Sequence, residues 1–307
     1  MSNPIAEPVN PMDIPGQLRG MSKQPLNPVE NPELMERFVD VDDTRVAFEQ
    51  FQRDFADPRW LDHGAIVIAT GRTQTGKTAL LYRCAQWLTE NLGAPGKNVV
   101  VFDCTRVPVT AGKAIDERMR EVCSYLKEEL FGAGVIVDDR LLSADSPGGI
   151  ISRLPKAVVP EVVVVVILPP SDDLTHEITQ YAQLVPKRVM LLTETAFVET
   201  AEDAYALVER SRAVSSVLEL GPLKATDGDL FYNERRGLYP DEAAVPPPTD
   251  GTLERIIKAR DTTIGDLQKL IWEVYDDIPR RNDAVPEVTY EHITDFYFRR
   301  ASHGGRR

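Results

Sequence analysis

The stretch Gly71-Arg72-Thr73-Gln74-Thr75-Gly76-Lys77-Thr78 decides the fold of this chain, because it matches the pattern G-x-x-x-x-G-K-[ST] at every fixed position. The apolar run 65–70 before it predicts a buried strand, and residues 77–92 after it have the spacing of an amphipathic helix. A strand, a glycine-containing loop and a helix in this order distinguish a phosphate-binding loop from a chance match. The sequence therefore predicts a loop that binds nucleotide phosphates.

Each residue type in the loop has a physical role. Gly71 and Gly76 allow the backbone to curl so that successive N–H groups point at phosphate oxygens, and the positive end of the following helix lies at the same place. We expect Lys77 to reach the β- and γ-phosphates and the Thr78 hydroxyl to ligate Mg²⁺. The predicted nucleotide-binding residues are Gly71, Arg72, Thr73, Gln74, Thr75, Gly76, Lys77, Thr78 and Ala79.

The composition narrows the classes of partner and compartment. The 307-residue chain has a formal net charge of −13, which disfavours nucleic acid and anionic lipid as partners, although a local basic patch would still bind DNA. Its longest apolar run, 162–168, is too short to span a membrane. The beginning of the chain lacks the pattern of a secretory signal, and its three cysteines show no pairing pattern. These features predict a cytoplasmic protein without a membrane segment.

Composition shifts divide the chain into five parts. Residues 1–40 are rich in proline and predict a disordered arm. An α/β domain is expected over 41–240, followed by a proline-rich linker over 241–250, a helical domain over 251–301 and a short tail over 302–307. The α/β domain contains five apolar segments, expected to be strands, at 65–70, 98–103, 162–168, 188–193 and 214–220. Helical patterns between them predict a parallel sheet with helices on both faces.

The phosphate loop and the order of these elements resemble P-loop ATPases of the AAA+ and STAND types over residues 41–300. The segment 218–223 is similar to the fifth strand and its exit in initiator-like members, and 289–293 is similar to the last helix of their lids. The resemblance implies a five-stranded sheet of order 5-1-4-3-2, a C-terminal helical lid, and ATP with Mg²⁺ as the ligands. The chain lacks the Asn-Lys-x-Asp tetrapeptide by which GTPases recognise guanine, which also favours ATP.

The expected third strand departs from this family at its end. It ends Leu168-Pro169-Pro170, where the family carries two successive acids for the Mg²⁺ shell and the attacking water. Asp172 and Asp173 follow a few residues later, and capping of the next helix is the favoured explanation for them. Asp103 ends the second strand and would face Mg²⁺ only if that strand lay beside 65–70. In the order 5-1-4-3-2 it lies at the far edge, so strand order decides its role.

Four further residues are candidates through the same resemblance. Thr193, at the end of the fourth strand, corresponds to a sensor of the γ-phosphate, and Glu194 is a candidate substitute for the missing catalytic acid. Hydrogen bonds within the turn are the alternative role for both. Arg210 and Arg212 stand where the family places an arginine finger donated to a neighbouring subunit. The alternative is that they are exposed arginines at the end of a helix.

The sequence leaves four functional hypotheses. In the first, ATP binding with weak or absent hydrolysis controls self-assembly or a protein partner. In the second, the chain is a scaffold that binds nucleotide without catalysis, which an absence of phosphate release despite ATP binding would reveal. In the third, it is a regulator linked to nucleic acid, against which the acidic composition argues. In the fourth, it is a small-molecule kinase, which requires Asp103 beside the phosphate loop.

Overall fold

A computed structural model describes residues 10–13, 24–108, 113–171, 175–197, 200–238, 246–280 and 285–304. The chain divides into two compact units. The sheet unit contains Leu26–Glu36 and Asp43–Leu220, and the helical unit contains Met1–Pro25, Arg37–Asp42 and Gly221–Arg307. The change from sheet to helical unit thus lies at Leu220, earlier than the boundary at 240 expected from the sequence. Within the described residues, no helix has both the length and the apolarity that a membrane span requires.

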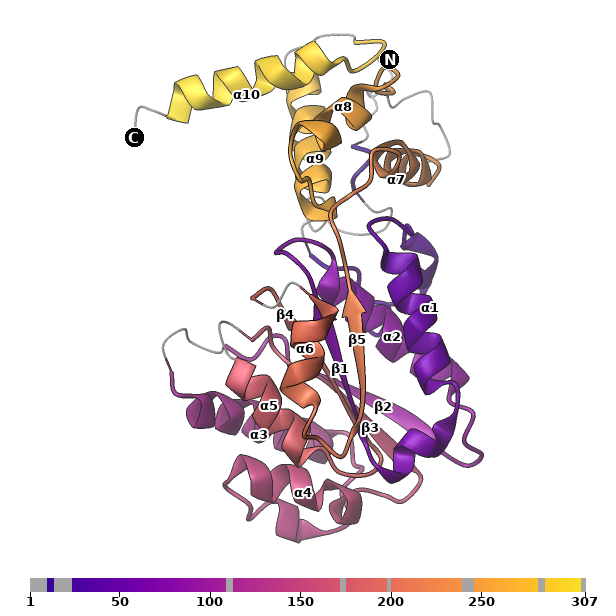
Figure 1. Cartoon of the computed structure of the whole chain (residues 1–307), viewed down its shortest axis with the longest axis vertical. Helices are drawn as coiled ribbons and strands as arrows, with labels where there is room; N and C mark the ends of the chain where they lie inside the picture. The colour runs from indigo at the N-terminus through magenta and orange to yellow at the C-terminus, as the bar shows by residue number, and fades with distance from the viewer. Residues whose placement is uncertain are drawn as a thin grey trace, which may run out of the picture. The chain divides into compact units, whose positions relative to one another are not determined.

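The centre of the sheet unit is a parallel sheet of five strands in the order β2-β3-β4-β1-β5 (Figure 1). The strands are β1 (Ala65–Thr70), β2 (Asn98–Asp103), β3 (Val162–Ile167), β4 (Val189–Thr195) and β5 (Val214–Glu219). This is the predicted order 5-1-4-3-2 counted from the other edge. The prediction of the sheet and of its order is confirmed, and β2 lies at an edge, separated from β1 by β3 and β4.

Helices cover both faces of the sheet, and the alternation of side chains along each strand supplies two cores. The first core contains Ala65, Val67 and Ala69 of β1 and packs against α1 (Thr44–Phe55) and α2 (Lys77–Asn91). The second contains Ile66 and Ile68. Its helices are α3 (Ile115–Gly132), α4 (Pro147–Ala157), α5 (Thr175–Leu184) and α6 (Ala201–Val208). We refer to the two sides of the sheet as the α2 face and the α3 face.

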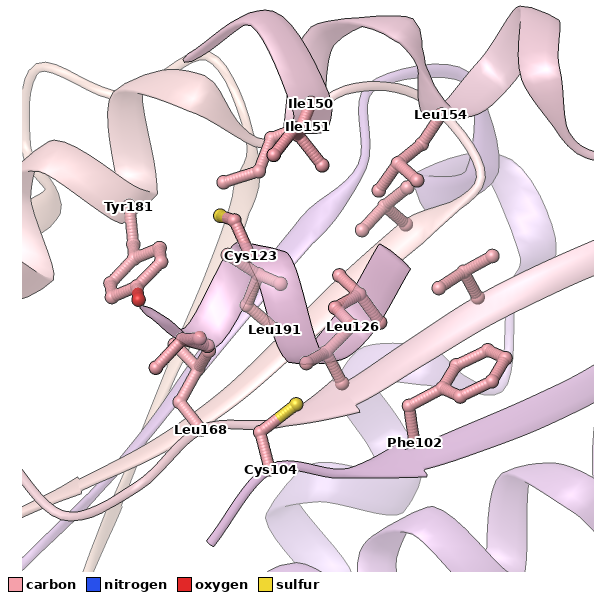
Figure 2. Packing of buried hydrophobic residues seen from close by; sticks show 14 of the residues in the cluster. Phe102, Cys104, Cys123, Leu126, Ile150, Ile151, Leu154, Leu168, Tyr181 and Leu191 are labelled. Carbon is pink, nitrogen blue, oxygen red and sulfur yellow. The ribbon is translucent and has the colours of Figure 1, made fainter. Parts of the chain in front are cut away.

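The second core holds two of the three cysteines. Figure 2 shows Cys104 and Cys123 among the apolar side chains of the α3 face. Cys84 lies in the first core, and all three thiols are buried and unpaired with one another. Burial raises the pKa of each thiol, to about 12 at Cys123. These cysteines therefore act as small apolar side chains in the folded protein. Two short 3₁₀ helices, η3 (Pro58–Asp62) and η4 (Asp139–Leu141), belong to the described part of this unit, and a third, η2 (Pro32–Arg37), ends one residue beyond Glu36.

The helical unit consists of α7 (Asp227–Arg236), α8 (Thr252–Ala259), α9 (Ile264–Arg280) and α10 (Tyr290–Gly304) around their own core. Gly228 lets α7 and α8 approach closely, because a Cβ atom there would lie 2.9 Å from the Leu253 Cβ. The Tyr275 hydroxyl donates to the Pro246 carbonyl at 2.5 Å. The Tyr232 hydroxyl lies 3.0 Å from the Tyr275 hydroxyl and also donates to the Pro246 carbonyl at 3.0 Å, so the proline-rich segment is tied to two helices.

Two parts of the proline-rich segment for which we predict disorder have defined packing. Met12 is fully buried in the core of the helical unit. The Asn10 amide donates to the Trp272 carbonyl at 2.8 Å, and the Trp272 indole N–H donates to Asp13 at 3.0 Å. Val29 packs against the first core of the sheet unit. A single apolar side chain can be buried without any periodic pattern around it, so these contacts have no local signal in the sequence.

Candidate nucleotide-binding site

The loop between β1 and α2 has the strained backbone that its glycines predict. Gly71 and Gly76 have positive φ angles of 135° and 82°, and Gln74 between them has 68°. A Cβ atom at Gly71 would lie 2.3 Å from the Leu220 carbonyl oxygen, so only glycine fits there. The Thr75 hydroxyl donates to the Arg72 carbonyl at 2.9 Å and helps to hold the curl. The loop therefore turns back on itself at the N-terminus of α2, where backbone N–H groups can bind an anion.

Lys77 lies inside this curl. Its ammonium group donates to the carbonyl oxygens of Gly71 at 2.8 Å and Arg72 at 2.6 Å, and its side chain is buried. Burial lowers the pKa of Lys77, and the nearby Glu194 carboxylate opposes that shift. The cation is thus held at the point where the loop would bind phosphate, by hydrogen bonds to the loop backbone.

Glu194 of β4 is the acid that the fold brings to the loop. The Thr78 hydroxyl donates to Glu194 Oε2 at 2.8 Å. The parallel register pairs Glu194 with Ala69, near the carboxyl end of β1. Met190 and Leu192 belong to the core on the α2 face, so alternation along β4 directs Glu194 to that same face. Burial raises the pKa of Glu194, while the hydrogen bond from Thr78 and the charge of Lys77 oppose the shift.

Thr193 does not share this position. It is buried, and alternation along β4 directs it to the α3 face, on the other side of the sheet from α2. The next threonine on that face, Thr195, accepts a hydrogen bond from the Phe197 N–H at 3.2 Å, as expected of a residue at a strand end. The role of Thr193 as a sensor of the γ-phosphate stays a prediction.

The other candidate acids do not lie at the phosphate loop in the described part of the chain. Asp103 is at the edge strand, where it accepts hydrogen bonds from the Tyr82 hydroxyl at 2.7 Å and from the Thr105 N–H at 2.9 Å. These contacts stabilise the turn that follows β2. Asp172 and Asp173 lie outside the described residues. Just before them, Ser171 donates from its N–H and its hydroxyl to the Glu194 carbonyl, both at 3.4 Å.

Arg210 and Arg212 lie at the opposite end of the sheet. Both are exposed between α6 and β5. β5 pairs with β1 from Ala65↔Val214 to Thr70↔Glu219, so about 20 Å of strand separates these arginines from the phosphate loop of the same chain. A contact between either arginine and a γ-phosphate would need a second copy of the chain, and this role stays a prediction.

One structural residue of the site was missed by sequence reasoning. Leu220 follows β5, and its N–H donates to the Thr70 carbonyl at 2.9 Å while its own carbonyl lies against Gly71. The close approach fixes where the loop begins. Its only signal in the sequence is the position of Leu220 just after an apolar strand. Among the described residues, no group of three or more His, Cys, Asp and Glu side chains could hold a metal ion on its own.

The comparisons with known proteins identify the fold. No family model and no curated protein matches the sequence. The ORC1 protein of Aeropyrum pernix, solved in complex with DNA, is 16% identical with a TM-score of 0.51, over 88% of this chain and 65% of that chain. Its ORC2 protein is 13% identical with a TM-score of 0.49, over 95% of this chain and 72% of that chain. Domain III of the Thermotoga maritima replication initiation protein DnaA is 12% identical with a TM-score of 0.47, over 89% of this chain and 97% of that one.

The chain thus spans about two thirds of the ORC1 protein, 65% of its length. The likeness to ORC1, the strand order and the strand–loop–helix around the phosphate loop agree with one another. Together they show that the chain has the fold of the AAA+ P-loop ATPases.

Proposed function

We propose that this chain binds ATP with Mg²⁺ in the loop 71–78 and uses it as a switch, with weak or absent hydrolysis, that controls self-assembly or a protein partner. The observation that carries the proposal is the curled loop at the end of β1, with the Lys77 ammonium group held against its backbone. Bound phosphates would accept hydrogen bonds from the loop N–H groups, and Lys77 would exchange its carbonyl contacts for phosphate oxygens.

The residues around the loop fit a magnesium nucleotide. Thr78, in the first turn of α2, presents a hydroxyl oxygen next to a carboxylate, and oxygen donors of this kind are those that Mg²⁺ prefers. The metal would neutralise phosphate charge when it is bound. Lys77 adds a second positive charge on the loop side, so this chain's own residues would hold the phosphates from the backbone and from one cation.

The residues that follow β3 support the proposal of weak hydrolysis. Pro169 and Pro170 stand where carboxylates would be needed, and Ser171 donates its hydrogen bonds to the Glu194 carbonyl. Among the described residues, the end of β3 therefore has no carboxylate that could act as general base for the attacking water. We expect turnover well below the ~10 per second of a typical enzyme.

Thermal unfolding with and without ATP and Mg²⁺ tests the binding site. ATP at 100 times its Kd should stabilise the folded protein by about 2.7 kcal/mol and raise the melting temperature. Lys77→Ala should remove most of this shift. Lys97→Ala is the matched control, because Lys97 lies at the other end of the sheet, where its ammonium donates to the Pro160 carbonyl at 2.7 Å. An equal shift in both variants would refute the assignment of the loop.

Phosphate release and DNA binding separate the other candidate functions. Release above the Lys77→Ala background over several hours supports a slow ATPase, whereas tight ATP binding without release supports a scaffold. The ORC1 protein was solved with DNA, which motivates a regulator linked to nucleic acid as the second candidate. The net charge of −13 argues against it. Binding to DNA that weakens steeply with added salt would favour this second candidate.

A further inference from the structure

Resting on the proposed nucleotide site, we infer that Glu194 of β4 is the carboxylate that binds Mg²⁺ together with the Thr78 hydroxyl, in place of an acid at the end of β3. The resemblance to AAA+ ATPases would instead place this metal-binding acid at the end of β3. It rests on the separation of two oxygen atoms, on the rigidity of the strand that carries one of them, and on the residues that follow β3.

The separation of the two oxygens fits a shared magnesium ion. Thr78 Oγ1 and Glu194 Oε2 lie 2.8 Å apart. Mg²⁺ binds oxygen ligands at about 2.0–2.1 Å in octahedral geometry, which places adjacent ligands about 2.8–3.0 Å from each other. The two side chains are therefore already spaced as neighbouring corners of such an octahedron. Only the hydroxyl proton has to rotate away for both oxygens to offer lone pairs to one cation.

The support of Glu194 is rigid. It lies on a strand that pairs with β1 on one side and β3 on the other. The residue is only 9% exposed, and its carbonyl accepts both hydrogen bonds from Ser171. A ligand carried by a central strand is positioned more accurately than one carried by a loop. Thr78 is equally fixed, because it belongs to the first turn of α2.

The end of β3 offers no competing ligand among the described residues. Pro169 and Pro170 have no side-chain donor atoms, and the Ser171 hydroxyl donates to the Glu194 carbonyl. Asp103 ends the edge strand, where it accepts hydrogen bonds from Tyr82 of α2 and from Thr105 of the following turn. Burying the Glu194 carboxylate costs free energy, of which the Thr78 hydroxyl and the charge of Lys77 offset a part, and a divalent cation beside it would offset more.

Isothermal titration of ATP in EDTA and in Mg²⁺ tests the inference. In the wild-type protein, Mg²⁺ should tighten ATP binding. Glu194→Gln keeps the size of the side chain and an acceptor for Thr78, so the fold should survive. This variant should lose tenfold or more of the Mg²⁺-dependent gain in affinity, whereas its affinity in EDTA should be unchanged or tighter, because a negative charge near the phosphates is removed. Asp103→Asn, the matched control, should keep the full gain.

A second measurement observes the metal directly. The electron paramagnetic resonance spectrum of Mn²⁺ with ATP and wild-type protein should show a bound ion, and Glu194→Gln should weaken or alter that signal. Full retention of the Mg²⁺ gain and of the Mn²⁺ spectrum in Glu194→Gln would overturn the inference, most directly if Asp172→Asn or Asp173→Asn removed them. Absence of ATP binding by the wild-type protein in both buffers would instead overturn the proposed function on which the inference rests.

Discussion

Replacing Gly71 by alanine should destabilise the sheet unit far more than the same change at Gly96. The two glycines are a matched pair, because both have a positive φ, 135° at Gly71 and 69° at Gly96. A Cβ atom at Gly71 would lie 2.3 Å from the Leu220 carbonyl oxygen, whereas a Cβ atom at Gly96 meets no heavy atom within 4 Å. The comparison therefore separates steric overlap from the conformational cost of a positive φ.

The magnitudes follow from these contacts. Gly96→Ala carries the cost of a left-handed alanine, about 1–2 kcal/mol. Gly71→Ala carries about 1–3 kcal/mol for its sparsely populated backbone conformation and about 1–3 kcal/mol more for overpacking. The overlap is hard to relieve, because the Leu220 N–H is bonded to the Thr70 carbonyl at 2.9 Å and the Leu220 side chain is buried. We expect a total of about 2–6 kcal/mol for Gly71→Ala.

Urea denaturation followed by tryptophan fluorescence measures both costs. The chain has three tryptophans. Trp60 and Trp87 belong to the sheet unit and Trp272 to the helical unit, so a Trp272→Phe background confines the signal to the sheet unit. The denaturation midpoint should fall in both variants, with little change of the m-value. Free energies of unfolding that agree within ~0.5 kcal/mol between Gly71→Ala and Gly96→Ala would refute the close approach to Leu220.

Four other experiments test the packing within each of the two units. Glu177→Gln removes the ionised partner of the buried Arg118, 3.1 Å away, and should cost about 3–5 kcal/mol in urea denaturation. Asp57→Asn, in an exposed pair, should leave the denaturation midpoint almost unchanged. The three buried cysteines should resist iodoacetamide until urea unfolds the protein, as judged by mass spectrometry; alkylation of the folded protein would contradict this. Because their pKa values are raised, the unfolded state loses thiol protons first above about pH 8.5, so the free energy of unfolding should fall with further rise in pH. Met12→Ala should destabilise the helical unit by about 2–5 kcal/mol. Urea denaturation monitored by Trp272 fluorescence measures this loss, and an unchanged stability would support the predicted disorder.

The strands could be predicted from the sequence because their signal is local. The run 162–168 is apolar throughout and becomes β3, buried on both faces between two neighbouring strands. The order of the strands is not a local property, and it came from the resemblance to AAA+ ATPases and not from periodicity. That order settled the position of Asp103, whose sequence context as an acid ending an apolar strand suits either an edge or a site. Met12 shows the opposite case, since its burial depends on partners about 250 residues away along the chain.

The choice between Thr193 and Glu194 shows why the sequence could name candidate residues for the site but could not predict which of them lie at the phosphate loop. Neighbouring residues on a strand face opposite sides of the sheet, so at most one of the two can approach α2. In a strand with one solvent-exposed face, the alternation of polar and apolar residues shows which residues point to solvent and which point to the core. β4 is buried along its whole length, and its residues Val189 to Leu192 are apolar on both sides, so its sequence carries no such mark. The packing of Met190 and Leu192 in the core on the α2 face determines which alternate residues of β4 point to that face. It brings Glu194, and not Thr193, to the Thr78 hydroxyl.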